Sequence, residues 1–214
     1  VGMGCRVPGA STPKAFWTLL RNGRDMITEI PSTRWDVNAY YSPEPNAAGK
    51  ISTRSGGFLE QIDQFDPHFF GISSREATSL DPQQRLLLEV SWEALENAGQ
   101  APKALAGKST GIFIGIGQTD YGHLQFSGDM TDITAYTVTG TGLCFAAGRL
   151  SYVLGTQGPV CSIDTACSSS LVAIHLACHS LHSQECRLAV AGGVHLNLYP
   201  ATTISLSQIK ALSP

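Results

Sequence analysis

The sequence predicts an α/β protein whose parallel or mixed sheet carries helices on its faces. Throughout the second half of the chain, short apolar segments of strand length alternate with longer segments that have helical spacing of apolar residues. Such alternation implies right-handed crossover units, which place the helices on the faces of the sheet. The 214 residues are 43% hydrophobic, which is enough for one sizeable core or two small ones. In chain order, we expect a strand at 109–117, a helix at 135–154, a strand at 159–166, a helix at 168–183 and a strand at 187–198.

The first 80 residues are less regular. The opening residues have a strand-like pattern, and the apolar residues of 13–23 share one face of a weak helix that Gly23 ends. Pro, Gly, Ser and Asp are frequent from about 28 to 80, so we expect a long irregular segment there, pinned by its aromatic rings. These rings are Trp35, Tyr40, Tyr41, Phe58, Phe65, Phe69 and Phe70. No repeat, low-complexity tract or linker interrupts the chain, so we expect one continuous unit over residues 1–214.

The segment LDPQQRLLLEVSWEALENAG (80–99) predicts the clearest helix of the chain. Asp81 is a suitable N-cap, Pro82 fits the first turn, and Gln84 stands at the capping-box position. Gly99 supplies the C-terminal stop. One apolar stripe contains Leu87, Val90, Ala94 and Ala98, joined by Leu88, Trp92 and Leu95. An apolar stripe with helical spacing is typical of a helix that packs on a core, so we interpret this segment as structural.

The charge of the chain and its lack of targeting signals limit the classes of function. The formal net charge of -3 gives no overall attraction to nucleic acid or to an anionic membrane. No apolar run approaches the roughly 18 residues that span a bilayer, and the opening VGMGCRVPGA lacks the features of a signal peptide. We therefore expect a cytoplasmic protein without nucleic-acid or membrane partners. The six cysteines form no CxxC pair, so we expect free thiols and no metal site.

The segment DTACSSSLVA (164–173) places Cys167 between a predicted strand and a predicted helix. Functional groups gather at the carboxyl ends of the strands in such sheets. A thiol at the start of a helix lies near the positive end of the dipole and near unpaired amides, which favour the thiolate. Small neighbours leave room for a substrate, and the amides could receive the oxyanion of a thioester carbonyl. The position also fits a small buried cysteine, so both interpretations stay open at the level of the residues.

Histidines elsewhere in the chain are the candidate bases for this thiol. His175, His179 and His182 lie on the same predicted helix, but even the nearest is roughly 12 Å along it, beyond hydrogen-bond reach. Their spacing puts them on one face, which we interpret as solvated because no further ligand completes a metal site. His123 and His195 follow other predicted strands, and by geometry alone His195 is the best candidate base.

The glycines of the chain do not indicate a nucleotide site. The opening GMGCRVPG departs from a dinucleotide fingerprint because Val7 stands where the last glycine is needed, so a tight turn is favoured. The glycines of GIGQ (115–118) and AGG (191–193) lie near the ends of predicted strands. We expect them to allow close backbone packing there and not to bind phosphate.

Several motifs resemble those of one family. DTACSSSLVA is similar to the active-site signature of β-ketoacyl synthases, the ketosynthase domains of modular polyketide synthases. VGMGCRVPGA resembles the opening strand and turn of that family, and FDPHFFGISSREATSLDPQQRLLLEVSWEALENAG (65–99) resembles its long N-terminal signature. AAGRLSYVLGTQGP (146–159) is similar to the helix before the active-site strand. Ser74 stands where proline is usual, but the resemblance extends over the whole chain.

The resemblance implies a thiolase-like fold, of which residues 1–214 would be the N-terminal half of a ketosynthase domain cut at both ends. It implies that Cys167 accepts an acyl chain from a phosphopantetheine thioester and that the Cys167 amide is one oxyanion donor. A malonyl-type extender on an acyl carrier protein then loses carbon dioxide and attacks the acyl-cysteine, which gives a β-ketoacyl thioester. The two catalytic histidines of the family lie in motifs beyond residue 214. We therefore expect His195 to support the site from outside the catalytic groups or to be structural. The chain alone is expected to load acyl groups poorly and not to complete condensation.

The resemblance also implies partners. They are the acyl carrier protein, neighbouring synthase domains such as an acyltransferase, and a second copy of the chain paired through the strand around Val160 to Asp164. The domain would bind no cofactor of its own, because its substrates arrive on the phosphopantetheine of the carrier protein. An iterative or fatty-acid-type synthase is the alternative within the class. A cysteine hydrolase that uses Cys167 with His195, or a scaffold with an inert thiol, is the alternative outside it.

Overall fold

The computed structural model describes residues 1–44 and 47–213, which belong to two compact units. The first, which we call the sheet unit, comprises Val1–Cys5 and Gln61–His195. The second, which we call the small unit, comprises Arg6–Glu60 and Leu196–Pro214. The assignment of residues 1–214 to one partial domain stays a prediction. Among the described residues, no helix is long and apolar enough to cross a membrane.

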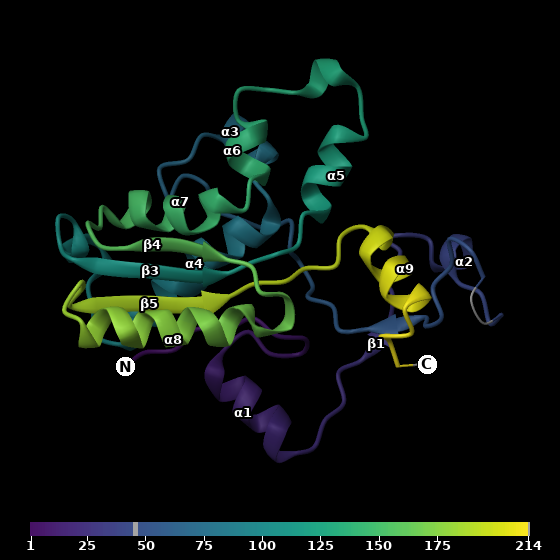
Figure 1. The fold of residues 1–214 in the computed structure, drawn as a ribbon, viewed down its shortest axis with the longest axis horizontal. Helices are drawn as coiled ribbons and strands as arrows, with labels where there is room; N and C mark the ends of the chain where they lie inside the picture. The colour runs from purple at the N-terminus through teal and green to yellow at the C-terminus, as the bar shows by residue number, and fades with distance from the viewer. Residues whose placement is uncertain (45–46, 214) are drawn as a thin grey trace. The chain divides into compact units, whose positions relative to one another are not determined.

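A three-stranded parallel sheet forms the centre of the sheet unit. Strand β3 (Thr110–Gly115) lies between β4 (Val160–Ile163) and β5 (Leu188–Gly193), as Figure 1 shows. All residues of β3 are buried, as expected for the middle strand of a parallel sheet that is covered on both faces. The three strands predicted in the second half of the chain are confirmed, and each is shorter than its predicted range.

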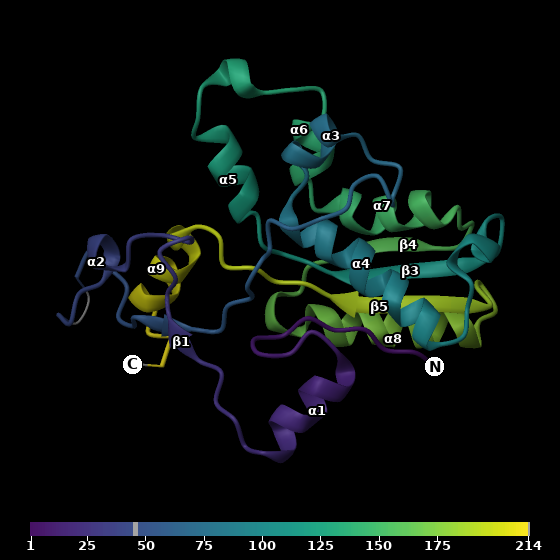
Figure 2. The ribbon, with the colours of Figure 1, turned by 180° about the vertical axis from the view of Figure 1, so that it is seen from behind.

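One face of the sheet is covered by α4 (Pro82–Asn97) and α7 (Cys144–Leu154), and Figure 2 shows α4 lying across the strands. Ile112 and Ile114 are two residues apart in β3 and therefore share a face; both are almost completely buried. They form one apolar cluster with leucines of α4 and with alanines and leucines of α7. Full burial of such a side chain contributes roughly 1.5–3 kcal/mol. The structural role predicted for α4 is therefore confirmed.

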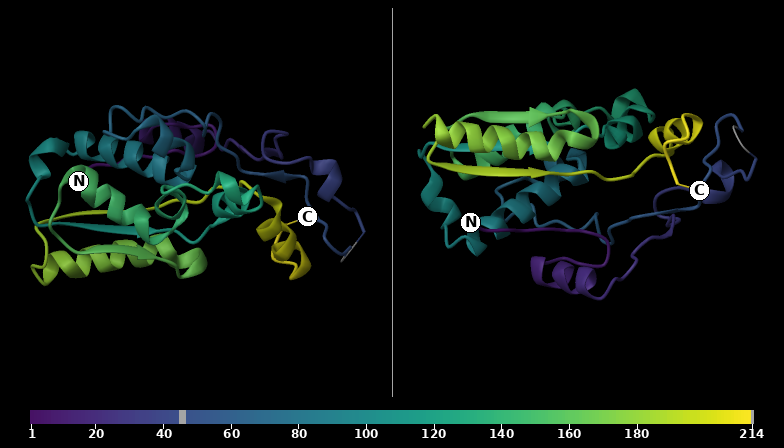
Figure 3. Two further views of the ribbon diagram at one scale, coloured as in Figure 1. Left: turned by 90° about the horizontal axis from the view of Figure 1, so that it is seen from above. Right: turned by 60° about the horizontal axis from the view of Figure 1, so that its bottom comes forward.

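The opposite face of the sheet is covered by α8 (Ser169–His182). Phe113, which lies between the two isoleucines of β3, points to this face and packs with Ala173 and Ala177 of the helix. The two alanines are small, so the helix lies close to the strands. Figure 3 shows α8 and α4 on opposite sides of the strands. The alternation of side chains along β3 thus explains the order of the layers, helix on sheet on helix.

The ends of α4 agree with the sequence except at one position. Asp81 caps the helix, because its Oδ1 accepts the N–H of Gln83 at 2.8 Å. The predicted capping box is wrong: the Asp81 N–H donates to the carbonyl of Gly140 at 2.9 Å. The side-chain amide of Gln84 donates to the same carbonyl at 2.9 Å. The Gly140 carbonyl, distant in the sequence, therefore accepts the Asp81 N–H that the Gln84 side chain would accept in a capping box. Gly99 has a φ of +67° and follows the end of the helix as predicted.

The strand-like pattern at the N-terminus does not lead to a strand: none is formed by residues 1–5, all of which the structure describes. The backbone of these residues runs along the stripe of α4 that contains Val90 and Ala94. A Cβ on Gly2 would collide with the carbonyl oxygen of Ala94, and one on Gly4 would collide with that of Val90. The glycines therefore let this segment lie directly on the helix, and this packing replaces strand pairing.

The helix predicted at 135–154 is divided in two. A short α6 (Thr137–Thr141) precedes α7, and Gly142 between them has an extended ψ of 128°. Gly140 of α6 lies against the backbone of Ser79, where a Cβ would collide with the Ser79 carbonyl. The position of α6 is therefore set by a segment about sixty residues earlier in the chain, which the local helical pattern does not reveal.

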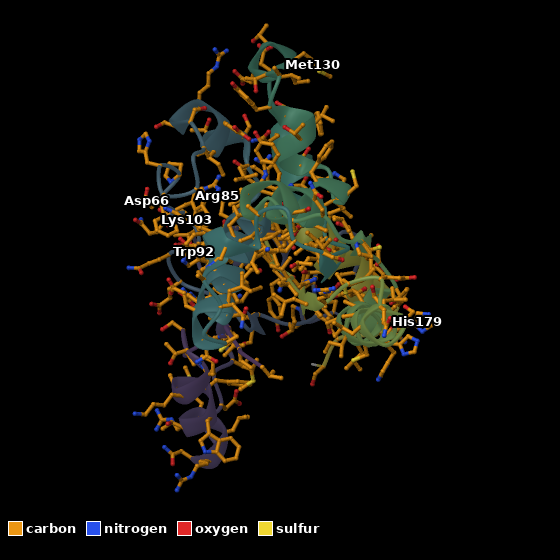
Figure 4. All side chains as sticks on the ribbon, turned by 90° about the vertical axis from the view of Figure 1, so that its left-hand side faces the viewer. Asp66, Arg85, Trp92, Lys103, Met130 and His179 are labelled. Carbon is orange, nitrogen blue, oxygen red and sulfur yellow. The ribbon has the colours of Figure 1, made fainter. Side chains whose placement is uncertain are left out.

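Short elements complete the sheet unit. They are α3 (Ser74–Ser79), η1 (Pro102–Leu105), α5 (Asp120–Phe126) and η2 (Met130–Asp132). Aromatic rings hold the irregular segment before α3, as predicted. Phe65 and Phe70 stack at 5.5 Å between centroids, and Phe69 meets Trp92 of α4 edge-on at 4.9 Å. Figure 4 labels Trp92 on its helix.

The small unit has little regular structure. Its elements are α1 (Pro13–Arg21), β1 (Thr28–Glu29), α2 (Val37–Tyr40), β2 (Ser55–Gly56) and α9 (Pro200–Gln208). Ile30, Trp35 and Ile51 form its buried cluster. The helix predicted at 13–23 is confirmed as α1. The sequence analysis missed α9, whose Gln208 side chain donates to the carbonyl of Ala47 at 2.9 Å.

A buried carboxyl group at the start of α4 gives the fold a dependence on pH. Asp81 is 1% exposed, and this burial raises its pKa from the ordinary 3.8 to about 6. Hydrogen bonds from Gln83 and the charge of Arg85 lower the pKa, but they only partly offset the burial. The folded chain therefore holds this proton to a higher pH than the unfolded chain does, so Asp81 favours folding most below pH 4.

We predict that Asp81→Asn removes this dependence. Asparagine is also a good N-cap and carries no charge, so wild type should lose stability relative to the variant as pH rises from 4 to 6. The difference should approach on the order of 3 kcal/mol. Denaturant unfolding at several pH values measures it.

Asp129→Asn is the control for this comparison. The pKa of the exposed Asp129 is lowered by hydrogen bonds from Thr131, so wild type should gain stability relative to this variant as pH rises. The same slope for both variants would contradict the assignment to burial of Asp81.

Candidate active site

Cys167 lies on an exposed turn between β4 and α8. The turn includes a short 3-10 segment, η3 (Ala166–Ser168), and α8 begins directly after it. Cys167 is a free thiol and is exposed, so it is not the small buried residue that the sequence also allowed. The predicted strand-to-helix position is confirmed, with one difference: the cysteine stands in η3 and not in the first turn of α8 itself.

The residue before the cysteine has an unusual backbone. Ala166 has a φ of +53°, in the left-handed region that residues with a Cβ rarely adopt. Its N–H donates to Oδ1 of Asp164 at 3.0 Å, and its carbonyl accepts from Oγ of Ser169 at 2.7 Å. The Ser169 oxygen also accepts the N–H of Thr165 at 2.9 Å. Side chains on both sides of the cysteine therefore hold the bend that presents it.

Glycines at the ends of β3 and β5 make room for this turn. A Cβ on Gly115 would lie 2.7 Å from the carbonyl carbon of Ser169, and one on Gly117 would lie 2.7 Å from Oδ1 of Asp164. A Cβ on Gly193 would lie 2.9 Å from Cβ of Ser170. The close backbone packing that we predicted is confirmed for Gly115. Gly117 and Gly193 lie closest to side-chain atoms, and for Gly192 the prediction is wrong, because a Cβ there would meet no atom within 4 Å. The turn rests on the carboxyl ends of the two neighbouring strands.

None of the histidines in the described chain forms a hydrogen bond with Cys167. His175, His179 and His182 are exposed on α8, and Figure 4 shows His179 on the outer side of the molecule. The solvated face that we predicted for them is confirmed, and the described residues contain no group of metal-binding side chains. His123 and His195 are also exposed. The structural role expected for His195 stays a prediction.

A buried polar cluster beside this site was missed by the sequence analysis. The side-chain amide of Gln83 donates to Oδ2 of Asp81 at 3.1 Å and to the carbonyl of Gln118 at 2.9 Å. The Gln118 side chain in turn donates to Asp120. All four side chains are buried. The cluster fixes the backbone that follows β3, next to Gly117. Its only sequence signal was the capping pattern at Asp81.

Comparison with known proteins identifies the family. All residues from 1 to 214 match the family model described as β-ketoacyl synthase, N-terminal domain. A phenolphthiocerol/phthiocerol polyketide synthase of Mycobacterium tuberculosis is 53% identical over 215 residues, which cover 100% of this chain and 12% of that protein. A mycocerosic acid synthase-like polyketide synthase of Mycolicibacterium smegmatis is 48% identical, with 100% and 10% covered.

Solved structures agree with the sequence comparison. An oxazolomycin ketosynthase domain from Streptomyces albus matches with a TM-score of 0.89 and 38% identity, over 100% of this chain and 36% of that one. The ketosynthase from module 6 of the bacillaene synthase of Bacillus subtilis matches with a TM-score of 0.87 and 38% identity, over 100% and 34%. The chain thus spans about a third of these ketosynthase structures and about a tenth of the curated polyketide synthases.

The layers of helix and sheet and the cysteine turn define a thiolase-like α/β protein, as the resemblance implied. The chain belongs to the β-ketoacyl synthase family, whose N-terminal domain it matches throughout.

We predict that Gly115→Ala destabilises the protein and disturbs the turn. The new Cβ would force the backbone of Ser169 to move, because it would lie 2.7 Å from that residue's carbonyl carbon. The expected loss is roughly 1–3 kcal/mol, the usual cost of overpacking. Denaturant unfolding measures the loss, and mass spectrometry after treatment with a thiol reagent measures the change in labelling of Cys167.

Gly192→Ala is the matched control, since a Cβ at this position in β5 would meet no atom within 4 Å. It should change stability by no more than about 0.5 kcal/mol. Equal stability of the two variants would contradict the proposed contact between β3 and the turn.

Proposed function

We propose that this chain provides the acyl-accepting part of a β-ketoacyl synthase in polyketide biosynthesis, with Cys167 as the nucleophile. The observation that carries the proposal is the exposed thiol of Cys167 on a hydrogen-bonded turn at the carboxyl ends of parallel strands. Ligand and catalytic groups gather at this end of such sheets. Membership in the family and the polyketide synthases among its relatives support the assignment.

In the first half-reaction, the sulfur of Cys167 attacks the carbonyl carbon of an acyl thioester carried on phosphopantetheine. A C–S bond forms at the cysteine, the bond to the carrier sulfur breaks, and the carrier thiolate takes up the proton that left Cys167. The N–H of Cys167 donates no hydrogen bond within the described chain, so it is available to the oxyanion. The start of α8 adds the positive end of a helix dipole.

In the second half-reaction, a malonyl-type extender on an acyl carrier protein loses carbon dioxide. The resulting carbanion attacks the carbonyl carbon of the acyl-cysteine, a C–C bond forms, and Cys167 leaves as thiolate. The product is a β-ketoacyl thioester on the carrier protein. The resemblance implies that the two histidines that serve this step lie in motifs beyond residue 214. We therefore expect residues 1–214 alone to load an acyl group poorly and not to complete the condensation.

The partners of this chain are proposals that follow from the same function. The acyl carrier protein brings both substrates, and neighbouring domains such as an acyltransferase would supply the extender. Strand β4 is an edge of the described sheet and Val160 is 40% exposed, which supports pairing of this strand with that of a second copy. We expect all these partners in the cytoplasm, where polyketide precursors would be available as thioesters.

The alternative functions give different products. A cysteine hydrolase would transfer the acyl group from Cys167 to water and release the free acid. An inert scaffold would leave the thiol without an acyl group.

We predict that Cys167→Ala abolishes acyl loading while the fold is retained. The variant lacks the sulfur that forms the thioester, and an exposed side chain contributes little to stability. The protein that contains this chain is incubated with an acyl-pantetheine thioester, and the mass shift of the intact protein reports loading. Circular dichroism checks the fold.

Cys178→Ala is the matched control, because Cys178 is also an exposed free thiol and lies on α8. It should load to the wild-type extent. Loading that persists in Cys167→Ala, or release of free acid at the rate of loading, would contradict the synthase assignment.

A further inference from the structure

We infer that Asp164 and Ser169 are positioning residues that hold Ala166 in its left-handed conformation and thereby fix the direction of the Cys167 sulfur. The inference rests on the proposed function of Cys167. Both backbone polar groups of Ala166 bind side chains: Asp164 accepts its N–H, and the Ser169 hydroxyl donates to its carbonyl, which also accepts the backbone N–H of Ser169. We call this arrangement the Ala166 clamp.

The clamp encloses the residue directly before the nucleophile. A left-handed φ at a residue with a Cβ is disfavoured, so Ala166 returns to an ordinary conformation unless its neighbours prevent it. Such a return would rotate the following peptide and with it both the N–H and the side chain of Cys167. The sulfur and the proposed oxyanion donor would then lose their common orientation toward one carbonyl group.

Ser169 is the buried member of the clamp. It is 7% exposed, and its hydroxyl spans the bend by accepting the N–H of Thr165 at 2.9 Å while it donates to the carbonyl of Ala166 at 2.7 Å. Because the one Ser169 oxygen makes both hydrogen bonds, a movement of either Thr165 or Ala166 would break one of them. Gly115 of β3 leaves the space that this serine needs, since a Cβ on Gly115 would lie 3.0 Å from Cβ of Ser169. The position of the serine is therefore set by the sheet.

Asp164 is the exposed member of the clamp. Its carboxylate accepts the N–H of Ala166 at 3.0 Å and lies against Gly117, which follows the end of β3 by two residues. The carboxylate is needed here as a hydrogen-bond acceptor. The clamp does not require its negative charge, which would oppose formation of a thiolate nearby. This difference between acceptor and charge allows the two roles to be separated by substitution.

The test uses the protein that contains this chain and an acyl-pantetheine thioester at several concentrations. Single-turnover loading of Cys167, followed by intact mass, gives a rate constant at saturation and a half-saturating concentration. Ser169→Ala and Asp164→Ala should each lower the rate constant by about 10- to 100-fold, as expected for a misdirected nucleophile, with little change in half-saturation. Asp164→Asn keeps the acceptor oxygen and should stay within about threefold of wild type.

Ser168→Ala is the matched control. The Ser168 hydroxyl donates to the carbonyl and the hydroxyl of Thr165, both at 2.8 Å, and does not touch Ala166. This variant should load within about threefold of wild type. Alkylation of Cys167 by iodoacetamide, a small reagent that needs no oxyanion donor, should also stay within about threefold in every variant. Retained alkylation shows that the thiol is still present and reactive, and circular dichroism of each variant shows that the fold is retained; together they separate a misdirected sulfur from an unfolded protein.

A double-mutant cycle tests whether Ser169 acts through Ala166. Glycine adopts a positive φ without the cost of a Cβ, so Ser169→Ala should lower loading less when Ala166→Gly is also present. An equal loss in both backgrounds would overturn the inference, as would wild-type loading in Ser169→Ala and Asp164→Ala. A loss in Asp164→Asn as large as in Asp164→Ala would also overturn it. Loading that survives in Cys167→Ala would contradict the proposed function of Cys167 itself. The failure of the clamp and the failure of the proposed function therefore give different results.

Discussion

The close approach between the end of β3 and the turn that carries Cys167 is the constraint on which the site depends. Gly115 is the last residue of β3 and Gly117 follows it two residues later, and each leaves the space that a clamp residue occupies. Because β3 is buried on both faces, its position is fixed by the two helical layers. The sheet therefore determines where Ser169 and Asp164 lie, and these residues determine where the cysteine lies.

The sequence was sufficient for the parts of the fold that depend on local periodicity. The short apolar segment of β3 and the apolar stripe of α4 predict a core that the structure confirms, since each pattern matches the geometry of one element. It was insufficient where a distant group decides the conformation. The carbonyl of Gly140 replaces the capping box of α4, and the backbone of Ser79 fixes the place where α6 and α7 separate. Neither partner is close in sequence to the residue that it controls.

The candidate site also has one part that the sequence predicts and another that it does not. The position of Cys167 between strand and helix could be predicted from the sequence, and the family resemblance identified it as the candidate nucleophile. The clamp could not be predicted, because its signal is a positive φ at an alanine and not at a glycine. DTACSSS contains three serines in a row, and only the conformation of Ala166 shows that Ser169 holds the bend while Ser168 bonds elsewhere.

The energies of the turn explain why its unusual conformation persists without a substrate. A left-handed alanine costs roughly 1–2 kcal/mol. Three hydrogen bonds oppose this cost, those of Asp164 and Ser169 with Ala166 and that of Thr165 with Ser169, and each contributes about 0.5–1.5 kcal/mol net. Their sum of about 1.5–4.5 kcal/mol is comparable to the cost or larger, so the bend is formed when the chain folds. In the function that we propose, a thioester would then meet a sulfur and an amide whose relative orientation needs no further ordering, which would lower the barrier to acyl transfer.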